Sequence, residues 1–181
     1  GIEVNKRKAS RYYQLAAYEG DVEAMQKFSS ILYNGDEIDS DKENKVQFYK
    51  MAADKGDINS MNIYANILFT GDGVEVDKKL AAKYYKAATD KGDIHAMNMY
   101  AYILEHGEGI KTNKVEAKKF YKIAADKGNS DSMLNYATML FNDKSNKDEM
   151  IVYFKMAINE GNTKAMHTYA TMLYKGDGVE M

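Results

Sequence analysis

Glycines recur at a fixed interval along this chain, and their spacing limits the possible folds more than any other feature. The glycines at positions 20, 56, 92, 128 and 161 are separated by 36, 36, 36 and 33 residues. A methionine, an aromatic residue and a leucine follow each of them at the same offsets, as in Met61, Tyr64 and Leu68 or Met97, Tyr100 and Leu104. Because periods of 20–50 residues are typical of stacked supersecondary units, the sequence predicts a repeat array.

Each repeat predicts two helices. In the third repeat, Met97, Ala101 and Leu104 follow the i, i+4, i+7 spacing of one helical face. We call the glycines at 20, 56, 92, 128 and 161 the key glycines. An Asp or Asn directly follows each key glycine, and another Asp or Asn stands fifteen residues before it. Both residue types are favoured at the N-cap, the position that begins a helix. The chain contains no proline and shows no strand-like alternation. We therefore expect an all-α fold, an α–α superhelix (solenoid) of about ten antiparallel helices.

The period also predicts the domain organisation. We expect residues 1–181 to form a single repeat array, cut from a longer chain. Its parts are a flanking helix at 1–19, repeats at 20–55, 56–91, 92–127 and 128–160, and a terminal half-repeat at 161–181. The fourth repeat is shorter than the others. Asp143 stands there where Gly71 and Gly107 occur in earlier repeats, and three residues are lost before the next helix.

The second half of each repeat carries a recognisable motif. In the third repeat it reads Ala117-x-x-Phe120-Tyr121-x-x-Ala124-Ala125-x-x-Gly128. This pattern resembles the Sel-1-like repeat, a relative of the tetratricopeptide repeat. The first half departs from the family, because Tyr-Ala stands where the family usually has Leu-Gly. The resemblance implies a non-enzymatic scaffold or adaptor that binds protein partners. Cysteine-rich secreted members are excluded, because this chain has no cysteine.

A partner-binding surface is expected on the first helix of each pair, which lines the concave face of such arrays. The predicted residues combine amides, which can pair with a peptide backbone, with aromatic anchors. They are Asn62, Asn66, Phe69, Asn98, Tyr102, Thr138 and Phe141. We expect them to bind a peptide or helix of a partner protein and to be left free of packing within the array. The alternative is that these positions are only the solvated faces of surface helices.

Catalytic and cofactor chemistry are not predicted. Without cysteine there is no thiol nucleophile, and no Ser-His-Asp constellation occurs on one face. The glycine-rich loop at 71–74 follows a helix and lacks the Lys-Ser/Thr that would hold a nucleotide. His95 and His106 are about 16 Å apart along one predicted helix, too far to share a metal ion. We therefore expect no enzyme activity, no cofactor and no metal.

The balance of charged side chains bears on which class of partner the chain can bind. The 25 basic and 27 acidic side chains give a net charge of −2, so nucleic acid is not expected as a partner. The lysines of the second helices have aspartates nearby, which predicts i, i+4 ion pairs on a solvated face. An RNA-binding helical-repeat array is the alternative, because pentatricopeptide repeats are also helix pairs of similar length.

Location and self-association are the remaining expectations. No stretch is apolar enough for direct membrane insertion, and no signal peptide is visible. Together with the missing cysteines, this favours a cytoplasmic, reducing location. The first and last helices keep the aromatic residues of interior repeats, such as Tyr12, Tyr13 and Tyr169. We therefore also expect a homodimer through uncapped array ends.

Overall fold

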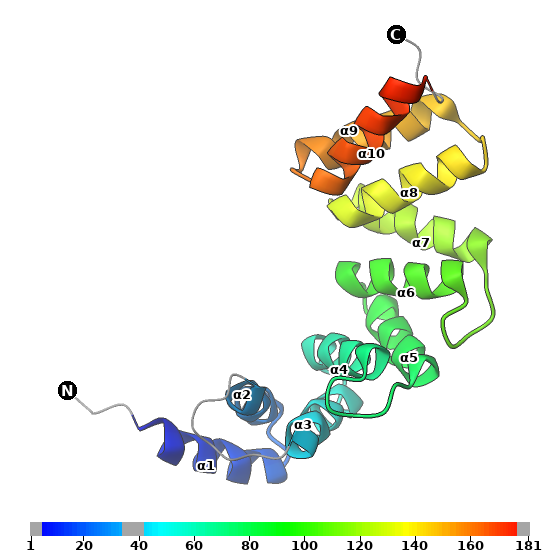
Figure 1. The fold of residues 1–181 in the computed structure, drawn as a ribbon. Coiled ribbons are helices and arrows are strands. Elements are labelled where there is room, and N and C mark those ends of the chain that lie inside the picture. Colours follow the sequence, from blue (N-terminus) through cyan, green and yellow to red (C-terminus); the bar gives the residue numbers. More distant parts are fainter. Residues whose placement is uncertain (1–4, 34–41, 177–181) are drawn as a thin grey trace. The chain divides into compact units, whose positions relative to one another are not determined.

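The computed structural model describes residues 5–33 and 42–176, and this part of the chain is entirely helical apart from its connections. It contains ten α-helices and no strand (Figure 1). The helices are α1 (Lys6–Tyr18), α2 (Val22–Tyr33), α3 (Lys42–Asp54), α4 (Ile58–Thr70), α5 (Lys78–Asp90), α6 (Ile94–His106), α7 (Lys114–Asp126), α8 (Ser130–Asn142), α9 (Lys147–Asn159) and α10 (Thr163–Lys175). The prediction of an all-α fold is confirmed.

The helices fall into two compact units. The first, residues 1–91, contains α1–α5, and the second, residues 92–181, contains α6–α10. The division coincides with the predicted boundary between the repeats at 56–91 and 92–127. Within each unit every helix packs against the next one along the chain. The two helices of a repeat therefore come from adjacent stretches of sequence.

Helix ends form where the cap residues predicted them. The side chains of Asp57, Asp93 and Asn129 accept hydrogen bonds from the backbone N–H groups three residues later, at 2.6–2.8 Å. These contacts satisfy donors that the first turn of a helix otherwise leaves unpaired. At the other end of α6, Gly107 adopts a left-handed conformation with φ of 72°, which a side chain would penalise. The cap pattern therefore sets both ends of α6.

Small residues and aromatic pairs build the core of both units. Ala65, Ala101 and Ala137 occupy equivalent positions and are fully buried, which lets neighbouring helices approach closely. The first helices α4, α6 and α8 each place a tyrosine edge-on against an aromatic residue of the second helix of the same repeat. These pairs, with centroid separations of 4.8–5.5 Å, are Tyr64–Tyr84, Tyr100–Phe120 and Tyr136–Tyr153. Such contacts contribute about 0.5–1.5 kcal/mol beyond the burial of area.

None of the described helices has the length and apolar character that a membrane crossing requires.

Candidate interaction surface

In the first unit, the predicted partner-binding residues lie on one face of α4. Asn62, Asn66 and Phe69 are spaced i, i+4 and i+7, so they form one stripe. Asn66 is exposed, while Asn62 and Phe69 are partly buried. The ammonium of Lys78 on α5 lies 5.3 Å from the centre of the Phe69 ring, a cation–π distance. This face of α4 therefore offers amide groups beside an aromatic ring with positive charge above it.

In the second unit, Asn98 does not lie free on the surface of α6. Its side chain is only 8% exposed, and Oδ1 accepts hydrogen bonds from Ser132 Oγ at 2.8 Å and Asn135 Nδ2 at 3.2 Å. The expectation that Asn98 is left free of packing is therefore wrong. The small, fully buried Ser132 lets α8 approach α6 closely enough for side chains to bridge them. A partner-binding role for Asn98 stays an untested prediction.

Tyr102 lies one turn after Asn98 on α6 and is partly exposed. Its ring stacks on the exposed ring of His106, with a centroid separation of 4.2 Å and an interplanar angle of 29°. His106 Nδ1 also lies 3.0 Å from the backbone oxygen of Tyr102, which fixes the imidazole relative to the helix. The two rings together form a flat aromatic platform at the C-terminal end of α6.

The remaining predicted residues lie on α8. Thr138 is partly buried and donates its hydroxyl hydrogen to the backbone oxygen of Leu134 at 2.8 Å. Phe141, at the last turn of α8, keeps 36% of its surface exposed. Asn135, which is not one of the predicted partner-binding residues, is partly exposed and donates a hydrogen bond to Asn98. Periodicity could not find Asn135, because its contact depends on the distance between α6 and α8.

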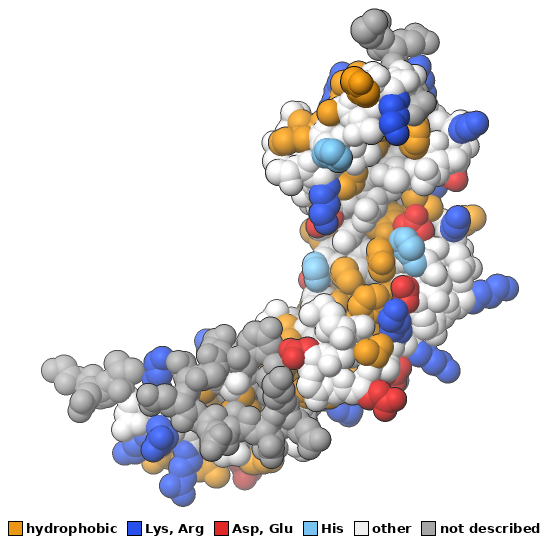
Figure 2. Space-filling model, in the orientation of Figure 1, with side chains coloured by type: hydrophobic (Ala, Val, Ile, Leu, Met, Phe, Trp, Pro, Cys, Tyr) orange, Lys and Arg blue, Asp and Glu red, His pale blue; other side chains and the backbone are white. Residues whose placement is uncertain are grey.

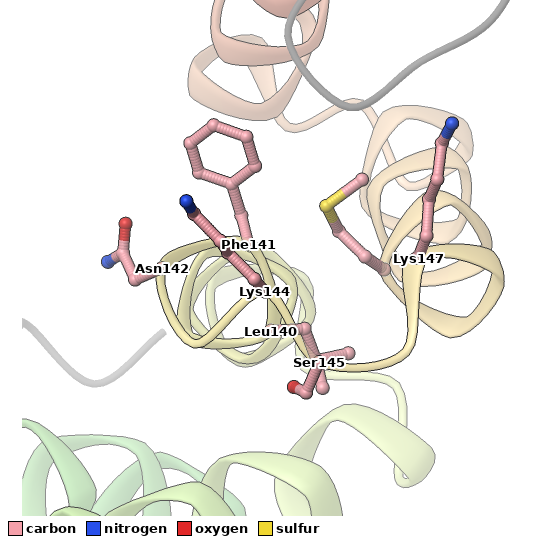
Figure 3. A pocket seen from close by; sticks show the side chains of 7 residues that line it. Leu140, Phe141, Asn142, Lys144, Ser145 and Lys147 are labelled. Carbon is pink, nitrogen blue, oxygen red and sulfur yellow. The ribbon is translucent and has the colours of Figure 1, made fainter.

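A pocket of about 500 Å³ opens where α8 connects to α9. Figure 3 shows Phe141 and Lys144 pointing the same way from the end of α8, with Lys147 across from them on α9. The lining residues are Leu140, Phe141, Asn142, Lys144, Ser145, Lys147 and Met150. Phe141 is thus the only predicted partner-binding residue among those that line this pocket.

The second helices carry paired charges on their outer faces. Lys50–Asp54 and Lys86–Asp90 form i, i+4 ion pairs at 2.7 Å, and the equivalent pair at Lys122 measures 3.7 Å. The predicted pairing is confirmed. Pairs of this exposure contribute only about 0.3–0.5 kcal/mol each.

A denser polar network joins α7, α8 and α9. Lys122 Nζ donates to the Tyr153 hydroxyl at 2.7 Å and to Glu149 Oε1 at 3.1 Å. The bond to Tyr153 is the main reason why the pKa of Lys122 is raised. Burial, with the neighbouring Glu149 carboxylate, raises the pKa of Tyr136 to about 12. Both groups therefore keep their ordinary protonation at neutral pH, and the network acts as a structural connection between helices.

Within residues 5–33 and 42–176, no three His, Asp or Glu side chains are grouped so that they could hold a metal ion.

The repeat pattern matches a known family. Consecutive matches to the family described as Sel1 repeat cover residues 1–21, 22–57, 58–93 and 94–129, which is more than half of the chain. The chain belongs to the Sel1 repeat family. Sel1 repeat proteins generally mediate protein–protein interactions, and the family is generally a non-enzymatic scaffold family. The resemblance inferred from the aromatic-pair motif is therefore confirmed.

Solved structures support the fold of this Sel1 array. A protective antigen of uropathogenic Escherichia coli displaying an SLR fold is 21% identical with a TM-score of 0.88, over 97% of this chain and 38% of its own. A Sel1 repeat protein from Oxalobacter formigenes is 22% identical with a TM-score of 0.83, over 100% of this chain and 73% of its own. Cysteine-rich protein B of Helicobacter pylori is 23% identical with a TM-score of 0.53, over 70% of this chain and 90% of its own. At these identities the likeness shows the α–α superhelical fold alone.

A search of the curated proteins found no match.

Proposed function

We propose that this Sel1 array is an interaction scaffold whose first helices bind a peptide or helix of a partner protein. The observation that carries the proposal is the partial exposure of aromatic rings on α4, α6 and α8, namely Phe69, Tyr102 and Phe141. A helix face that contacts only solvent does not require exposed aromatic rings. Aromatic side chains with accessible faces are enriched at protein–protein interfaces, where they supply most of the binding energy.

The chemistry of these faces fits an extended or helical peptide. In the second unit, the Tyr102–His106 platform provides a flat surface for an apolar side chain. Asn135 lies nearby on α8 and carries an amide that can both donate to and accept from a peptide group. In the first unit, Asn66 and Phe69 repeat this combination on α4. Each unit thus carries its own binding face, and the proposal needs no particular arrangement of one unit relative to the other.

The test is affinity capture from native cell extract, followed by titration of the purified partner with variants of this chain. Tyr102→Ala is expected to weaken binding at least about tenfold, because truncating an interface anchor costs more than 1 kcal/mol. Val115→Ala is the matched control, since Val115 is an apolar residue on the outer helix α7 that is 84% exposed. Equal binding by both variants, with unchanged melting temperatures, would overturn the proposal for the second unit.

The RNA-binding alternative has one feature in its favour. A hollow of about 570 Å³ on the outer side of α7 is lined by four lysines, namely Lys114, Lys118, Lys119 and Lys122. Lys118 is however paired with Asp143 at 3.0 Å and Lys122 with Glu149 at 3.1 Å. This compensation weakens the attraction for a phosphate backbone. Binding of single-stranded RNA that falls steeply with salt would favour the alternative.

We also propose that this polypeptide associates with a second copy through its terminal helices. Tyr12 and Tyr13 on α1 are 62% and 36% exposed, whereas Tyr85 and Tyr121, the equivalents of Tyr13, are fully buried. Leu173 on α10 is likewise exposed, unlike its equivalent Leu140. Figure 2 shows apolar side chains at the surface over α9 and α10, with lysines around them. The face of α10 therefore carries the residue types that, in interior repeats, are covered by the second helix of the pair. Helix α1 carries the residue types of such a covering second helix.

Mixing end-blocked variants tests this arrangement. Tyr12→Asp and Leu173→Asp chains are each expected to be monomeric by light scattering, while a mixture of the two regains dimers. The reason is that each variant keeps the end which the other has lost, as a head-to-tail contact requires. A mixture that stays monomeric at concentrations where the unmodified chain associates would contradict head-to-tail docking. The cytoplasmic location expected from the sequence stays a prediction.

A further inference from the structure

All three histidines of the chain lie on first helices of the second unit. His95 and His106 are on α6, and His167 is on α10. Each of them is exposed, and Figure 2 shows all three at the surface that is turned to the viewer. Histidine is the side chain that ordinarily changes charge between about pH 5 and 8. In this molecule such groups are therefore confined to the helices that we propose for partner binding.

Hydrogen bonds between the first helices of this unit show that they form one continuous surface. Asn98 on α6 accepts hydrogen bonds from Ser132 and Asn135 on α8. The N-cap residue of α10, Asn162, donates its Nδ2 hydrogen to Asp131 Oδ1 on α8 at 3.0 Å. Helices α6, α8 and α10 therefore lie side by side in this order.

The contacts of His106 determine which of its ring nitrogens can gain a hydrogen. Nδ1 lies 3.0 Å from the backbone oxygen of Tyr102, and because a carbonyl oxygen can only accept, Nδ1 carries the hydrogen of this bond. In the neutral ring Nε2 is then an acceptor, and after protonation it is a charged donor. The stacking of the ring on Tyr102, at a centroid separation of 4.2 Å, is compatible with both states. Acidification therefore changes what this ring edge can bind without requiring the ring to move.

The carboxylates on these first helices already accept hydrogen bonds from neutral donors. Glu105 Oε2 lies 3.9 Å from His106 Nδ1 and accepts from the hydroxyl of Tyr121 on α7 at 3.1 Å. Asp131 accepts from Asn162, as described above. Against α10, the next helix α9 places an aromatic ring, with Phe154 and Tyr169 5.9 Å apart. The other charged side chains on α10 and on the loop after α6 are Lys164, Lys175, Glu108 and Lys111.

The middle of this surface is uncharged at neutral pH. Its side chains are those of Met99, Tyr102, Asn135, Thr138 and Thr171. On the three helices themselves, the two carboxylates offset the two lysines. Protonation of the histidines therefore converts a balanced surface into one with three additional positive charges.

We propose that this surface binds a carboxylate-bearing segment of the partner protein in mildly acidic conditions, when His95, His106 and His167 are charged. The inference rests on the proposed function, since it specifies the charge of the bound segment and the regulation of the same helices. An apolar side chain of the segment packs on the rings of Tyr102 and His106, and a carboxylate beside it accepts from His106 Nε2. An extended segment of about six residues reaches from α6 to α10, because packed helices are about 8–10 Å apart and an extended residue spans about 3.3 Å.

The experiment is a calorimetric titration of the 181-residue chain with the probe acetyl-Asp-Phe-Asp-Leu-Asp-amide at about pH 5.5 and about pH 7.5. The carboxylates of the probe stay ionised at both values, because aspartate titrates at about 3.9. We expect binding to be at least about fivefold tighter at the lower pH, since each exposed ion pair supplies up to about a factor of five. A matched probe with Asn in place of each Asp is expected to bind within about twofold at both pH values. An equal pH response of the two probes would overturn the proposal.

Glutamine variants assign the pH response to particular rings. His106→Gln is expected to lower the ratio of the two affinities by about twofold or more, and adding His95→Gln and His167→Gln is expected to abolish it. All three positions are exposed, so the melting temperature at neutral pH should not change. Lys155→Gln, at an exposed position on α9, is the control that removes a positive charge from a second helix and should leave the ratio unchanged. A triple histidine variant that keeps the full ratio would contradict the assignment.

The remaining outcomes separate this inference from the broader proposal. A probe that binds equally at both pH values would refute the pH dependence, whereas partner capture with Tyr102→Ala decides the scaffold function independently. Absence of binding at probe concentrations up to about 10 mM would likewise refute this inference alone. Tighter binding of oligouridylate than of the probe at the lower pH would assign the charged surface to phosphates, which would overturn the peptide assignment.

Discussion

Helices α8 and α10 have closely similar residues at their packing positions but very different surroundings. Met133 and Leu140 on α8 are 3% and 2% exposed, whereas the equivalent Met166 and Leu173 on α10 are 41% and 45% exposed. The difference arises because α8 packs against both α7 and α9, whereas α10, among the described helices, packs mainly against α9. The same side chain therefore stabilises the array in one position and forms apolar surface in the other. Equivalent substitutions in interior and terminal helices measure this difference directly.

The largest difference is expected at the tyrosine of each first helix. Tyr136 is buried, packs edge-on against Tyr153 at 4.8 Å and donates to Glu149 at 3.1 Å. Tyr136→Ala is expected to lower the free energy of unfolding by about 3–5 kcal/mol. Tyr169→Ala, in the partly exposed equivalent on α10, should cost less than about 2 kcal/mol. Urea denaturation followed by circular dichroism measures both, and equal losses would mean that α10 is covered in solution.

A smaller difference is expected at the leucine that ends each packing stripe. Leu140→Ala creates a cavity beside a well-packed core and is expected to cost about 2–5 kcal/mol. Leu173→Ala removes an exposed side chain and should change stability by no more than about 0.5 kcal/mol. Calorimetry of the two variants gives the comparison. A loss of several kcal/mol for Leu173→Ala at low protein concentration would contradict the exposed position of this residue.

Asn98 on α6 and His167 on α10 occupy equivalent positions, six residues after a key glycine. Substituting them compares a buried polar side chain with an exposed one. Asn98→Ala would leave Ser132 and Asn135 without the oxygen that they share. We expect a loss of about 1–3 kcal/mol, the usual cost of unpaired buried polar groups. His167 is the exposed equivalent on α10, and His167→Ala should stay within about 0.5 kcal/mol. If Asn98→Ala is equally neutral, the α6–α8 hydrogen bonds do not contribute to stability.

The smallest difference is expected at the helix-ending glycines. Gly107 and Gly176 have φ of 72° and 69°, so alanine at either position costs about 1–2 kcal/mol. At Gly107 the added Cβ would also lie 2.6 Å from Thr112 Oγ1, whereas at Gly176 it would meet nothing within 4 Å. Gly107→Ala is therefore expected to lower the melting temperature more than Gly176→Ala. Combining Gly107→Ala with Thr112→Ala should remove that excess, and persistence of the excess would point to another cause.

Sequence periodicity predicted those parts of the fold that each repeat determines locally. The caps at Asp93 and Asn129 and the buried alanines follow from spacing and side-chain type. Periodicity failed at Asn98, because its burial depends on how closely α8 approaches α6. It also did not predict the pocket at Lys144. The three-residue loss was visible in the sequence, but whether neighbouring side chains would fill the space depends on packing.

The order of contacts along the chain has a consequence for how the molecule folds. Every described helix has its main packing partner directly before or after it in sequence, so most of the core forms between neighbouring segments. Proteins rich in such local contacts fold in microseconds to milliseconds. Folding of this chain can begin at any well-packed helix pair and spread outward to its neighbours. During synthesis, each repeat can therefore dock onto the one before it as soon as it leaves the ribosome.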